Sequence, residues 1–438
     1  MDMALPVTWE TSTLGSMAQG FLSGGTPSTK NKAFWQGPIP WITSKWLNLR
    51  LYLDSGEKFI SEDAVRQSAT TVVPRNNLIF ATRVGVGKVA VNRLDLAINQ
   101  DLAGILVDSG RYDICFLAYQ LRTERIQNAV ASHKRGATIQ GITRDSLKEL
   151  EIYLPPLPEQ RKIAGVLGVV QRAIEQQERL LQLTAELKKT LLHQLFTQGL
   201  RGEPQKQTEI GPVPESWEVV PLSDCAVVQT GVAKGRKLDG KDTLTLPYLR
   251  VANVQSGYLD LIEMKTTTIQ AKEKARYSLQ KGDVVLTEGG DFDKLGRGFI
   301  WKGEVEDCVH QNHIFVVRVD RLRVLPEFFA HLSQSPYGKA YFLSVAHKTT
   351  NLACINTTRL KGFPVLIPSL HEQREIVDLL EAVDAKIFLH ECKKQSLTDL
   401  FRTLLHQLMT AQIRVHGLDL SVLGTIDFGR DESNRKKI

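Results

Sequence analysis

Residues 154–195 read LPPLPEQRKIAGVLGVVQRAIEQQERLLQLTAELKKTLLHQL, and residues 367–408 read IPSLHEQREIVDLLEAVDAKIFLHECKKQSLTDLFRTLLHQL. The two stretches align without a gap, and 18 of the 42 aligned positions are identical. The chain is therefore a tandem duplication with a period of 213 residues. This repeat sets the expected domain boundaries and the fold class.

A weaker similarity marks the start of each half. Three residues have counterparts 208 positions later, namely Pro6, Trp9 and Leu14 against Pro214, Trp217 and Leu222. Between the shared ends, residues 1–153 and 214–366 barely resemble each other, apart from short matches such as Ile142 with Ile355. We name these two stretches the variable regions. We name the repeated ends and long helices the frame, and we expect the two halves to share this frame while their variable regions differ.

The composition indicates a folded protein with a basic surface. Of the 438 residues, 42% are hydrophobic and 24% are charged, and the net charge of +7 with a pI near 9.0 favours a polyanionic partner such as nucleic acid. The five cysteines stand far apart without a CxxC pair, which argues against a zinc site and a disulfide framework. No apolar stretch reaches membrane-spanning length and the first residues do not resemble a signal peptide, so we expect a cytoplasmic protein.

Hydrophobic residues recur at alternating steps of four and three in both repeats, which is typical of a coiled-coil seam. In the second copy the seam residues are Ile376, Leu380, Val383, Ile387, Leu397, Phe401, Leu404 and Leu408, with His390 and Lys394 in the same register. In the first copy they are Ile163, Leu167, Val170, Ile174, Leu181, Leu191 and Leu195, interrupted by Thr184 and Lys188. Three further leucines, Leu180, Leu183 and Leu187, widen the neighbouring stripe.

Each repeat predicts one long helix. Pro155, Pro158 and Pro368 stand where a helix begins, which is the place that tolerates proline, and Glu159 and Glu372 then complement the helix dipole. A helix over residues 158–197 would be about 60 Å long and apolar on one side, so it needs a partner in water. We expect the two helices to pair as an antiparallel coiled coil.

The variable regions have the pattern of mixed α/β domains. Strand-like runs lie at 77–81, 88–91, 283–287 and 313–319, and helical stretches lie near 114–127 and 326–346. The predicted fold class is α+β. The predicted division is 1–153 (first variable region), 154–198 (central helix), 199–213 (linker), 214–366 (second variable region), 367–412 (C-terminal helix) and 413–438 (tail).

Several short motifs resemble catalytic or metal sites but fail in detail. RVGVGKVAV at 83–91 lacks the first glycine and the Ser or Thr of a phosphate-binding loop. The stretch 289–294 is explained as a turn rich in Gly and Asp, and His310 and His313 beside Cys308 lack a second pair of zinc ligands. An Asn-Pro-Pro-aromatic tetrapeptide of adenine methyltransferases is absent from the sequence. We predict no catalytic residue, no metal and no cofactor in this chain.

The two unlike variable regions are each followed by a PLPEQ-type helix start (155–160 and 368–373), and the segment GLRGEPQKQTEIGPVPESWEVVPL lies at 199–222. In these features the chain resembles the specificity subunit of type I restriction-modification enzymes. The resemblance covers essentially the whole chain, although His371 stands where the first copy has Pro158. It implies that each variable region is a target-recognition domain for one half of an interrupted DNA site.

The same resemblance implies the partners. The paired helices would set the spacer between the half-sites and bind two modification subunits, which transfer methyl groups from S-adenosylmethionine to adenine. Restriction subunits, which translocate and cut DNA with ATP, would be further partners. The chain itself would be a binding subunit without catalysis.

Polar and basic residues near predicted turns are the candidates for DNA contact, because Lys and Arg bind phosphates while Arg, Asn, Gln and Thr match base edges. In the first variable region they are Thr43, Ser44, Lys45, Arg83, Lys88, Asn99, Gln100, Lys134, Arg135 and Thr138. In the second they are Arg250, Asn253, Lys294, Arg297, Gln311, Asn312, Lys348, Thr349 and Asn351. The pairs Asn99-Gln100 and Gln311-Asn312 each lie between strand-like runs, where they either contact adenine or satisfy turn backbone.

Three other interpretations stay open at this point. A fused nuclease or methyltransferase is disfavoured by the missing motifs. A coiled-coil scaffold that binds only proteins explains the helices but not two divergent regions that carry basic residues. A specificity subunit of a related modification-cleavage system outside type I has the same sequence features.

Overall fold

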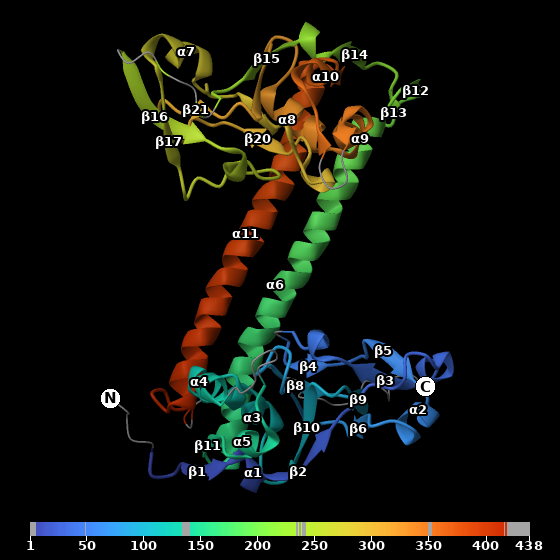
Figure 1. Cartoon of the computed structure of the whole chain (residues 1–438), viewed down its shortest axis with the longest axis vertical. Coiled ribbons are helices and arrows are strands. Elements are labelled where there is room, and N and C mark those ends of the chain that lie inside the picture. The colour runs from blue at the N-terminus through green and yellow to red at the C-terminus, as the bar shows by residue number, and fades with distance from the viewer. Residues whose placement is uncertain are drawn as a thin grey trace. The chain divides into compact units, whose positions relative to one another are not determined.

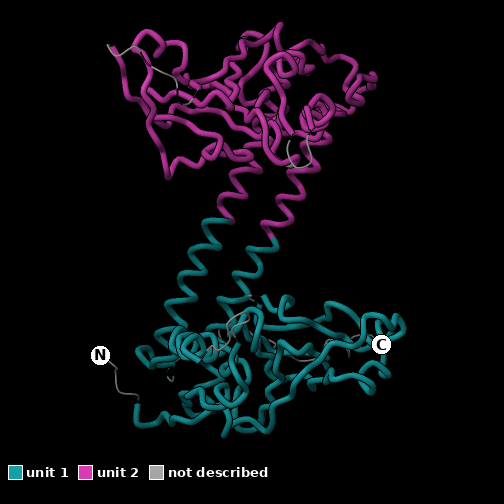
Figure 2. The backbone as a smooth tube through the Cα atoms, in the orientation of Figure 1, with its two compact units in different colours: residues 1–179, 391–438 teal, residues 180–390 magenta. Residues whose placement is uncertain are grey.

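The computed structural model describes residues 6–48, 50–133, 141–233, 235, 238, 242–348, 353–415 and 417. The chain divides into two compact units (Figure 2), unit 1 with residues 1–179 and 391–438 and unit 2 with residues 180–390. Each long helix contributes one part to each unit. Unit 1 contains the first variable region, and unit 2 contains the second.

The two repeats form the two long helices, α6 (Leu157–Gln198) and α11 (Leu370–Met409) (Figure 1). In unit 1 the first part of α6 lies beside the last part of α11, and Lys394 Nζ is 2.9 Å from Glu178 Oε1. In unit 2 the last part of α6 lies beside the first part of α11, where Lys188 pairs with Asp384. The predicted antiparallel pairing is confirmed.

The seam residues are buried or half-buried in the structure, as their register predicts. Ile163 and Leu167 of α6 and Ile376 and Leu380 of α11 are all at most 1% exposed. By contrast, the three leucines of the neighbouring stripe, Leu180, Leu183 and Leu187, are 39%, 42% and 48% exposed. These three leucines lie outside the seam and leave an apolar stripe on the outer face of α6.

Unit 1 is built on two β-sheets. The five-stranded sheet has the order β2 (Ala18–Ser23), β10 (Leu102–Val107), β7 (Leu78–Ala81), β8 (Val89–Asn92) and β4 (Tyr52–Leu53). The four-stranded sheet has the order β5 (Lys58–Ile60), β3 (Ile39–Ile42), β9 (Leu96–Ile98) and β6 (Thr71–Val73). The helices are α1 (Leu14–Met17), α2 (Glu62–Arg66), α3 (Ile114–Leu121), α4 (Glu124–Ser132) and α5 (Arg144–Lys148).

Unit 2 is also built on β-sheets, but the number and length of their strands differ from those in unit 1. Its main sheet has the order β15 (Ala226–Thr230), β22 (Ile314–Val319), β18 (Val284–Thr287) and β20 (Gly298–Ile300). Two smaller sheets have the orders β17 (Lys265–Gln270), β16 (Thr243–Leu249), β21 (Val309–His310) and β19 (Gly289–Gly290), β24 (Ala353–Cys354), β23 (His347–Lys348). The helices are α7 (Lys274–Tyr277), α8 (Pro326–Gln334), α9 (Pro336–Val345) and α10 (Thr357–Lys361). The predicted strands and helices of both variable regions are confirmed to within a few residues.

The similar ends of the two variable regions meet as paired strands. In unit 1, β1 (Glu10–Thr13) pairs antiparallel with β11 (Glu151–Leu154). In unit 2, β14 (Glu218–Pro221) pairs antiparallel with β25 (Pro364–Ile367). Trp9 and Trp217, which precede the first strand of each pair, are 6% and 0% exposed. The repeated ends are therefore the places where each variable region closes on itself.

The glutamine of each PLPEQ-type segment fastens the long helix to its variable region. Gln160 Nε2 donates to the Pro155 carbonyl at 2.8 Å, and Gln160 Oε1 accepts from Asp113 N at 2.9 Å. Gln373 Nε2 donates to the Pro368 carbonyl at 3.0 Å, and Gln373 Oε1 accepts from Leu325 N at 2.8 Å. Asp113 and Leu325 are the N-caps of α3 and α8, so each glutamine satisfies a backbone donor at a helix start.

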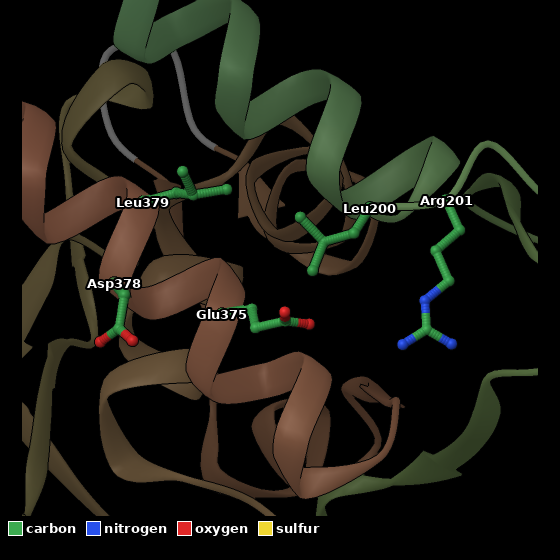
Figure 3. A pocket seen from close by; sticks show the side chains of 5 residues that line it. All are labelled: Leu200, Arg201, Glu375, Asp378 and Leu379. Atoms are coloured by element: carbon green, nitrogen blue, oxygen red, sulfur yellow. The ribbon is translucent and has the colours of Figure 1, made fainter.

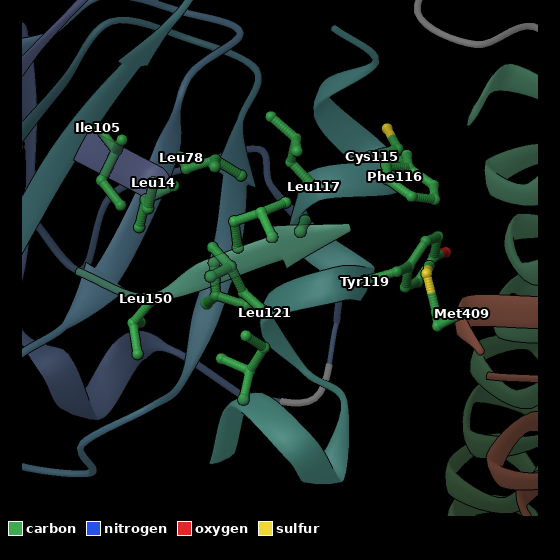
Figure 4. Close-up of a cluster of buried hydrophobic side chains, with 14 of the residues drawn as sticks. Leu14, Leu78, Ile105, Cys115, Phe116, Leu117, Tyr119, Leu121, Leu150 and Met409 are labelled. Atoms are coloured by element: carbon green, nitrogen blue, oxygen red, sulfur yellow. The ribbon is translucent and has the colours of Figure 1, made fainter. Parts of the chain in front are cut away.

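Each core is completed by the far end of the other half's helix. Leu408 and Met409 at the end of α11 belong to the core of unit 1, and Figure 4 shows Met409 beside Tyr119. In unit 2, Leu195 and Phe196 at the end of α6 belong to the core, and the ring centroids of Phe196 and Phe328 are 5.3 Å apart. The coiled coil and the domains are thus one continuous hydrophobic structure within each unit.

The predicted linker after α6 is ordered. Residues 205–214 form a hairpin of β12 (Gln205–Thr208) and β13 (Gly211–Pro214). Thr208 Oγ1 donates to the Gly211 carbonyl at 2.7 Å, and Gly211 has φ +134°, a backbone conformation that favours glycine. Polar composition with Gly and Pro is common to linkers and to hairpins, so the sequence did not distinguish them. Of the predicted tail, only residues 413–415 and 417 are described.

Candidate nucleic-acid interface

A parallel strand pair ends at the same place in both variable regions. In unit 1, Ile42 of β3 lies opposite Ile98 of β9, and in unit 2, Leu249 of β16 lies opposite His310 of β21. The next residue donates back across each pair: Asn99 N to Ile42 O at 3.1 Å, and Gln311 N to Leu249 O at 3.0 Å. The turns Asn99-Gln100 and Gln311-Asn312 therefore occupy equivalent positions.

A glycine packs against each of these strand ends. A Cβ on Gly24 would lie 2.1 Å from the Ile98 carbonyl oxygen, and a Cβ on Gly231 would lie 2.0 Å from the His310 carbonyl oxygen. The residue after each glycine donates to the same carbonyl, Gly25 N at 3.0 Å and Val232 N at 2.8 Å. Only glycine fits at such a backbone crossing. This pair of positions was not found from the sequence, because its signal lies in a contact between distant segments.

A second crossing joins three loops in each unit. In unit 1, Thr82 N donates to Asp101 O at 2.8 Å and Ile142 N donates to Thr82 O at 2.9 Å. In unit 2, Glu288 N donates to His313 O at 3.0 Å and Ile355 N donates to Glu288 O at 2.9 Å. The short sequence match of Ile142 with Ile355 thus marks equivalent backbone.

These crossings gather the loops of each variable region along one margin of its sheets. We name this margin the loop edge. In unit 1 it comprises residues 24–26, 43–47, 82–88, 99–101 and 141–142. In unit 2 it comprises residues 231–233, 250–254, 288–297, 311–313 and 353–355. The backbones correspond, whereas most of the side chains differ.

A basic residue closes the same loop in both units. Ala81 N donates to Lys88 O at 2.8 Å, and Thr287 N donates to Arg297 O at 2.9 Å, so Lys88 and Arg297 are equivalent. Their side chains also reach equivalent turns: Lys88 Nζ donates to Leu47 O at 3.0 Å, and Arg297 Nη2 lies 3.4 Å from Val251 O. Each cation therefore supports the turn that follows the parallel strand.

The sequence matches the family described as "Type I restriction modification DNA specificity domain" over residues 6–185 and 214–399. The chain belongs to this family. The two matched stretches are the two halves of the duplication, each with its variable region and most of its long helix. The two loop edges are accordingly the loop edges of two DNA specificity domains.

Known proteins of the specificity family match the whole chain. The type I restriction enzyme MjaIX specificity subunit of Methanocaldococcus jannaschii is 24% identical over 94% of this chain and 95% of its own length. The crystal structure of a type I S subunit from M. genitalium aligns with a TM-score of 0.54 at 17% identity, over 93% of this chain and 98% of that chain. A chain of a type I system solved to explain complex assembly and conformational transition aligns with a TM-score of 0.56 at 17% identity, over 94% of this chain and 100% of that chain. The two structural likenesses support the fold.

Several of the predicted DNA-contacting residues present exposed side chains in the specificity domains. They are Lys45, Arg83, Lys88 and Gln100 in unit 1 and Lys294 and Lys348 in unit 2. Lys294 is paired with Asp291, and Gln100 Oε1 accepts from Thr26 Oγ1 at 2.6 Å. Half-buried side chains are Thr43, Arg250, Arg297, Gln311 and Asn312.

Three predicted residues are buried, and two of them, Asn99 and Asn253, hold their loops together. Ser44, Asn99 and Asn253 are 2%, 3% and 4% exposed. Asn99 Nδ2 donates to Asp101 Oδ2 at 3.0 Å, and Asn253 Nδ2 donates to Asp260 O at 2.8 Å. A polar residue near a turn is an equally good signal for a surface contact and for turn support, so the sequence could not separate these roles. Lys134, Arg135, Thr138, Thr349 and Asn351 lie outside the described residues.

The prediction from the sequence missed two carboxylates that contact loop-edge residues. Glu57 Oε2 accepts from Thr43 N at 3.0 Å and from Thr43 Oγ1 at 2.7 Å. In unit 2, His313 Nδ1 contacts the carboxylate of Glu288. Glu57 and Glu288 are distant in sequence from Thr43 and His313, and the criteria of basic or amide side chains near turns do not select carboxylates.

The buried thiols and imidazoles of the domains are held in their neutral forms. Burial raises the pKa of Cys115 to about 11 and that of Cys308 to about 12, so both thiols stay protonated at neutral pH. Burial lowers the pKa of His310 to about 4. Among the described residues no group of three or more His, Cys, Asp or Glu is placed to hold a metal ion. In the same part of the chain, no helix is long and apolar enough to cross a membrane.

Unit 2 has an open hollow of about 540 Å³ outside its loop edge. It is lined by Leu200 and Arg201, which follow α6, and by Glu375, Asp378 and Leu379 of α11, and Figure 3 shows Glu375 extending into the hollow between Asp378 and Arg201. The hollow combines charges of both signs with two leucines. It is separate from the groups that the loop edge offers to a duplex.

Proposed function

We propose that the chain is the DNA-specificity subunit of a type I restriction-modification complex. Each variable region reads one half of a bipartite DNA site through its loop edge. The paired helices set the spacer between the half-sites and bind two modification subunits. The observation that carries this proposal is the pair of loop edges, in which the same backbone crossings present different side chains.

The charge of the loop edge fits a duplex. On the loop edge of unit 1, the exposed Lys45, Arg83 and Lys88 are suited to phosphates. In unit 2 the exposed Lys348 on β23 lies opposite the loop-edge residue Ala353 and is suited to the same role. Half-buried polar side chains lie on the same edge, where base edges are read by fixed donors and acceptors. The chain carries an excess of positive charge, +7, which favours association with DNA.

The buried Ser44, Asn99 and Asn253 have a different role in this proposal. The side-chain amides of Asn99 and Asn253 are used inside the loops, and Ser44 is buried, so we assign all three to loop support rather than to DNA contact. Gln100 and Asn312, which follow the equivalent strand ends, keep exposed or half-buried amides for base edges. The role of each residue thus follows from its burial.

The helices supply a surface for partner subunits. Leu180, Leu183 and Leu187 form an exposed apolar stripe on α6, one turn apart along one face. The corresponding positions of α11, 213 residues later, are Lys393, Ser396 and Leu400, of which Leu400 is 46% exposed. The corresponding face of α11 thus keeps one exposed leucine and is otherwise polar. We place the two modification subunits on these corresponding faces of α6 and α11.

The chemistry in this proposal belongs to the partners. Modification subunits supply S-adenosylmethionine and methylate adenine, and restriction subunits supply ATP-driven translocation and cleavage. In this proposal the present chain recognises the DNA sequence and contributes no catalytic residue. In this scheme its own contributions are binding, positioning and spacing.

Mapping of methylated adenines tests the proposal. In cells that express the chain with its modification subunits, we expect methylation at one interrupted motif, and its loss when the chain is omitted. Arg83→Ala should then relax one position of one half-site, at a cost of about 1 to 3 kcal/mol, if Arg83 reads a base, or weaken all sites alike if it binds a phosphate.

Arg66→Ala is the matched control for Arg83, because Arg66 is an exposed arginine of α2 in the same unit. It should leave the motif and the extent of methylation unchanged. Methylation without any motif, or an assembled complex that does not retard DNA in a gel, would contradict the proposal. The second result would favour a scaffold that binds only proteins.

A further inference from the structure

The crossing of three loops places two different side chains at one backbone position. Thr82 N donates to Asp101 O in unit 1, and Glu288 N donates to His313 O in unit 2, so Asp101 and His313 are equivalent. Asp101 is half-buried, and the side chain of His313 is 58% exposed. Both residues follow directly on the turn after the parallel strand, within the loop edge.

The ring of His313 is held in one orientation. Its Nδ1 contacts the Glu288 carboxylate, and since a carboxylate only accepts hydrogen bonds, Nδ1 carries the proton. The amide Nδ2 of Asn312 lies 3.5 Å from Nε2, which is longer than an ordinary hydrogen bond, so the single lone pair of Nε2 is left for another donor. In its neutral form, His313 therefore presents Nε2 as an acceptor on the loop edge.

Asp101 presents an acceptor in the same place. Its Oδ2 accepts from Asn99 Nδ2 at 3.0 Å, and its backbone N–H donates to Asn99 Oδ1 at 3.2 Å. The first bond orients the Asp101 carboxylate and leaves Oδ1 available, and the second joins the Asp101 backbone to the Asn99 side chain. The two variable regions thus differ in residue type here but agree in hydrogen-bonding character.

The partner of these acceptors on a duplex is a base rather than a phosphate. A carboxylate is present at both positions, Asp101 itself in unit 1 and Glu288 beside His313 in unit 2, and carboxylates repel phosphates. Acceptors match the amino groups that adenine and cytosine present in the major groove. Cations for the phosphates stand nearby in the chain, at Arg83 and Lys88 in one unit and at Arg297 in the other.

We propose that Asp101 and His313 are specificity-determining residues of the two half-sites. Each accepts a hydrogen bond from the major-groove amino group of an adenine or cytosine, at a corresponding position of its half-site. Glu288 is a positioning residue that orients the His313 ring. This inference rests on the proposed function and adds the class of base that each domain requires at this position.

Methylation by the complete complex, assayed on DNA libraries with randomised half-sites, tests the assignment. His313→Ala should relax one position in one half-site, with discrimination there falling roughly 10- to 100-fold. His313→Gln retains an acceptor and should retain part of the preference. Asp101→Asn should relax the corresponding position of the other half-site, because its amide adds a donor that also fits guanine or thymine.

Glu288→Gln separates positioning from contact. It should lower discrimination at the His313 position less than His313→Ala does, and should have no further effect in the double variant. His371→Ala is the control, because His371 is an exposed histidine at the start of α11 in the same unit. Its motif should equal that of the wild type.

The outcomes separate the two proposals. A wild-type motif that His313→Ala, His313→Gln and Asp101→Asn leave unchanged overturns the present inference while the proposed function stands. Equal weakening at every sequence also overturns it, because it indicates a phosphate contact. The inference is also overturned if the variants relax a position at which the wild-type complex requires guanine or thymine. A wild-type complex that methylates without a bipartite motif overturns the proposed function itself.

Discussion

The two halves of the chain agree where the backbone must close and differ where side chains face outward. The strand pairs β1–β11 and β14–β25, the glutamines Gln160 and Gln373, and the glycines Gly24 and Gly231 are equivalent. At the loop edge, Asp101 stands in one half and His313 in the other. The comparison teaches that the duplicated part of this protein is its frame.

The halves also differ in how the long helices are fastened. In unit 1, Arg414 after α11 holds Glu159 at the start of α6, with Nε to Oε1 at 2.7 Å and Nη2 to Oε2 at 3.0 Å. The equivalent residues in unit 2 are Arg201 and Glu372, and there Glu372 Oε1 lies 3.5 Å from Leu200 N while Arg201 lines the open hollow. One half has an ion pair where the other has a weak backbone contact.

The test with the largest expected effect replaces one variable region by the other. We expect a chain in which residues 14–150 replace residues 222–363 to fold and to direct methylation to a site with two copies of one half-site. The strand pairs that flank both segments are equivalent, so the exchange keeps each closure. Methylome sequencing reports the motif. Retention of the original second half-site in this chimera would show that the variable regions do not carry the specificity.

An insertion in the long helices changes their length and leaves both variable regions intact. Four residues added after Thr184–Leu187 of α6 lengthen the helix by about 6 Å and rotate its C-terminal part by about 40°. A matched insertion between Asp384 and Ala385 of α11 keeps the Lys188–Asp384 pair. We expect the DNA spacer to grow by one or two base pairs with both half-sites unchanged. An active double insertion with an unchanged spacer would eliminate the proposed ruler.

Removal of an arginine should affect the two halves unequally. Glu159 is 8% exposed as a side chain, so Arg414→Ala leaves a buried carboxylate without its partner and should destabilise the protein by about 3 kcal/mol. Arg201→Ala removes the equivalent residue where no such pair exists, and should cost less than about 0.5 kcal/mol. Urea unfolding of the two variants measures the difference. Equal losses would contradict the assignment of the ion pair to unit 1.

Acid should weaken unit 2 through a residue that unit 1 lacks. His310 takes the place of Ile98, and its folded pKa of about 4 lies below the ordinary value of 6.5. The unfolded chain therefore binds the proton first, so this contribution is complete above pH 6.5 and is lost as the pH falls toward 4. The loss at pH 5 is about 2 kcal/mol.

His310→Ile should remove this part of the acid sensitivity. Unfolding free energies at pH 7 and pH 5 measure it, with His371→Ala as the exposed control. Desolvation also lowers the pKa of the half-buried His331 to about 4, so the variant should keep a smaller acid loss than the wild type. An unchanged difference between the two pH values would contradict the role of His310.

The repeat predicted the frame well because its signals are local. Seam residues such as Ile163 and Leu380 recur at helical spacing, and the glutamine of each PLPEQ-type segment recurs unchanged. The sequence did not predict that the similar ends of the halves pair as strands, nor the order of the strands in the sheets. Hydrophobic periodicity and sequence identity therefore sufficed for the long helices and the fold class.

The loop edge was predicted only in part, because its construction depends on long-range contacts. Arg83 and Lys88 are cations beside a glycine turn, which the sequence shows. The sequence left Asn99 open as an adenine contact or a support for turn backbone, and the structure buries it against Asp101. The orientation of His313 depends on its contact with Glu288, which is 25 residues earlier in the chain. Burial and partners across the chain decide these roles, and neither is visible in a single sequence.

The interleaving of each core with the far helix end constrains how the chain is made. Leu408 and Met409 complete the core of unit 1, so a ribosome finishes the first variable region long before the residues that seal it emerge. Unit 2, whose boundaries lie between residues 180 and 390, is synthesised in full while unit 1 waits. The order of completion is thus the reverse of the order of synthesis, and the first-made region keeps an incomplete core until the end of translation.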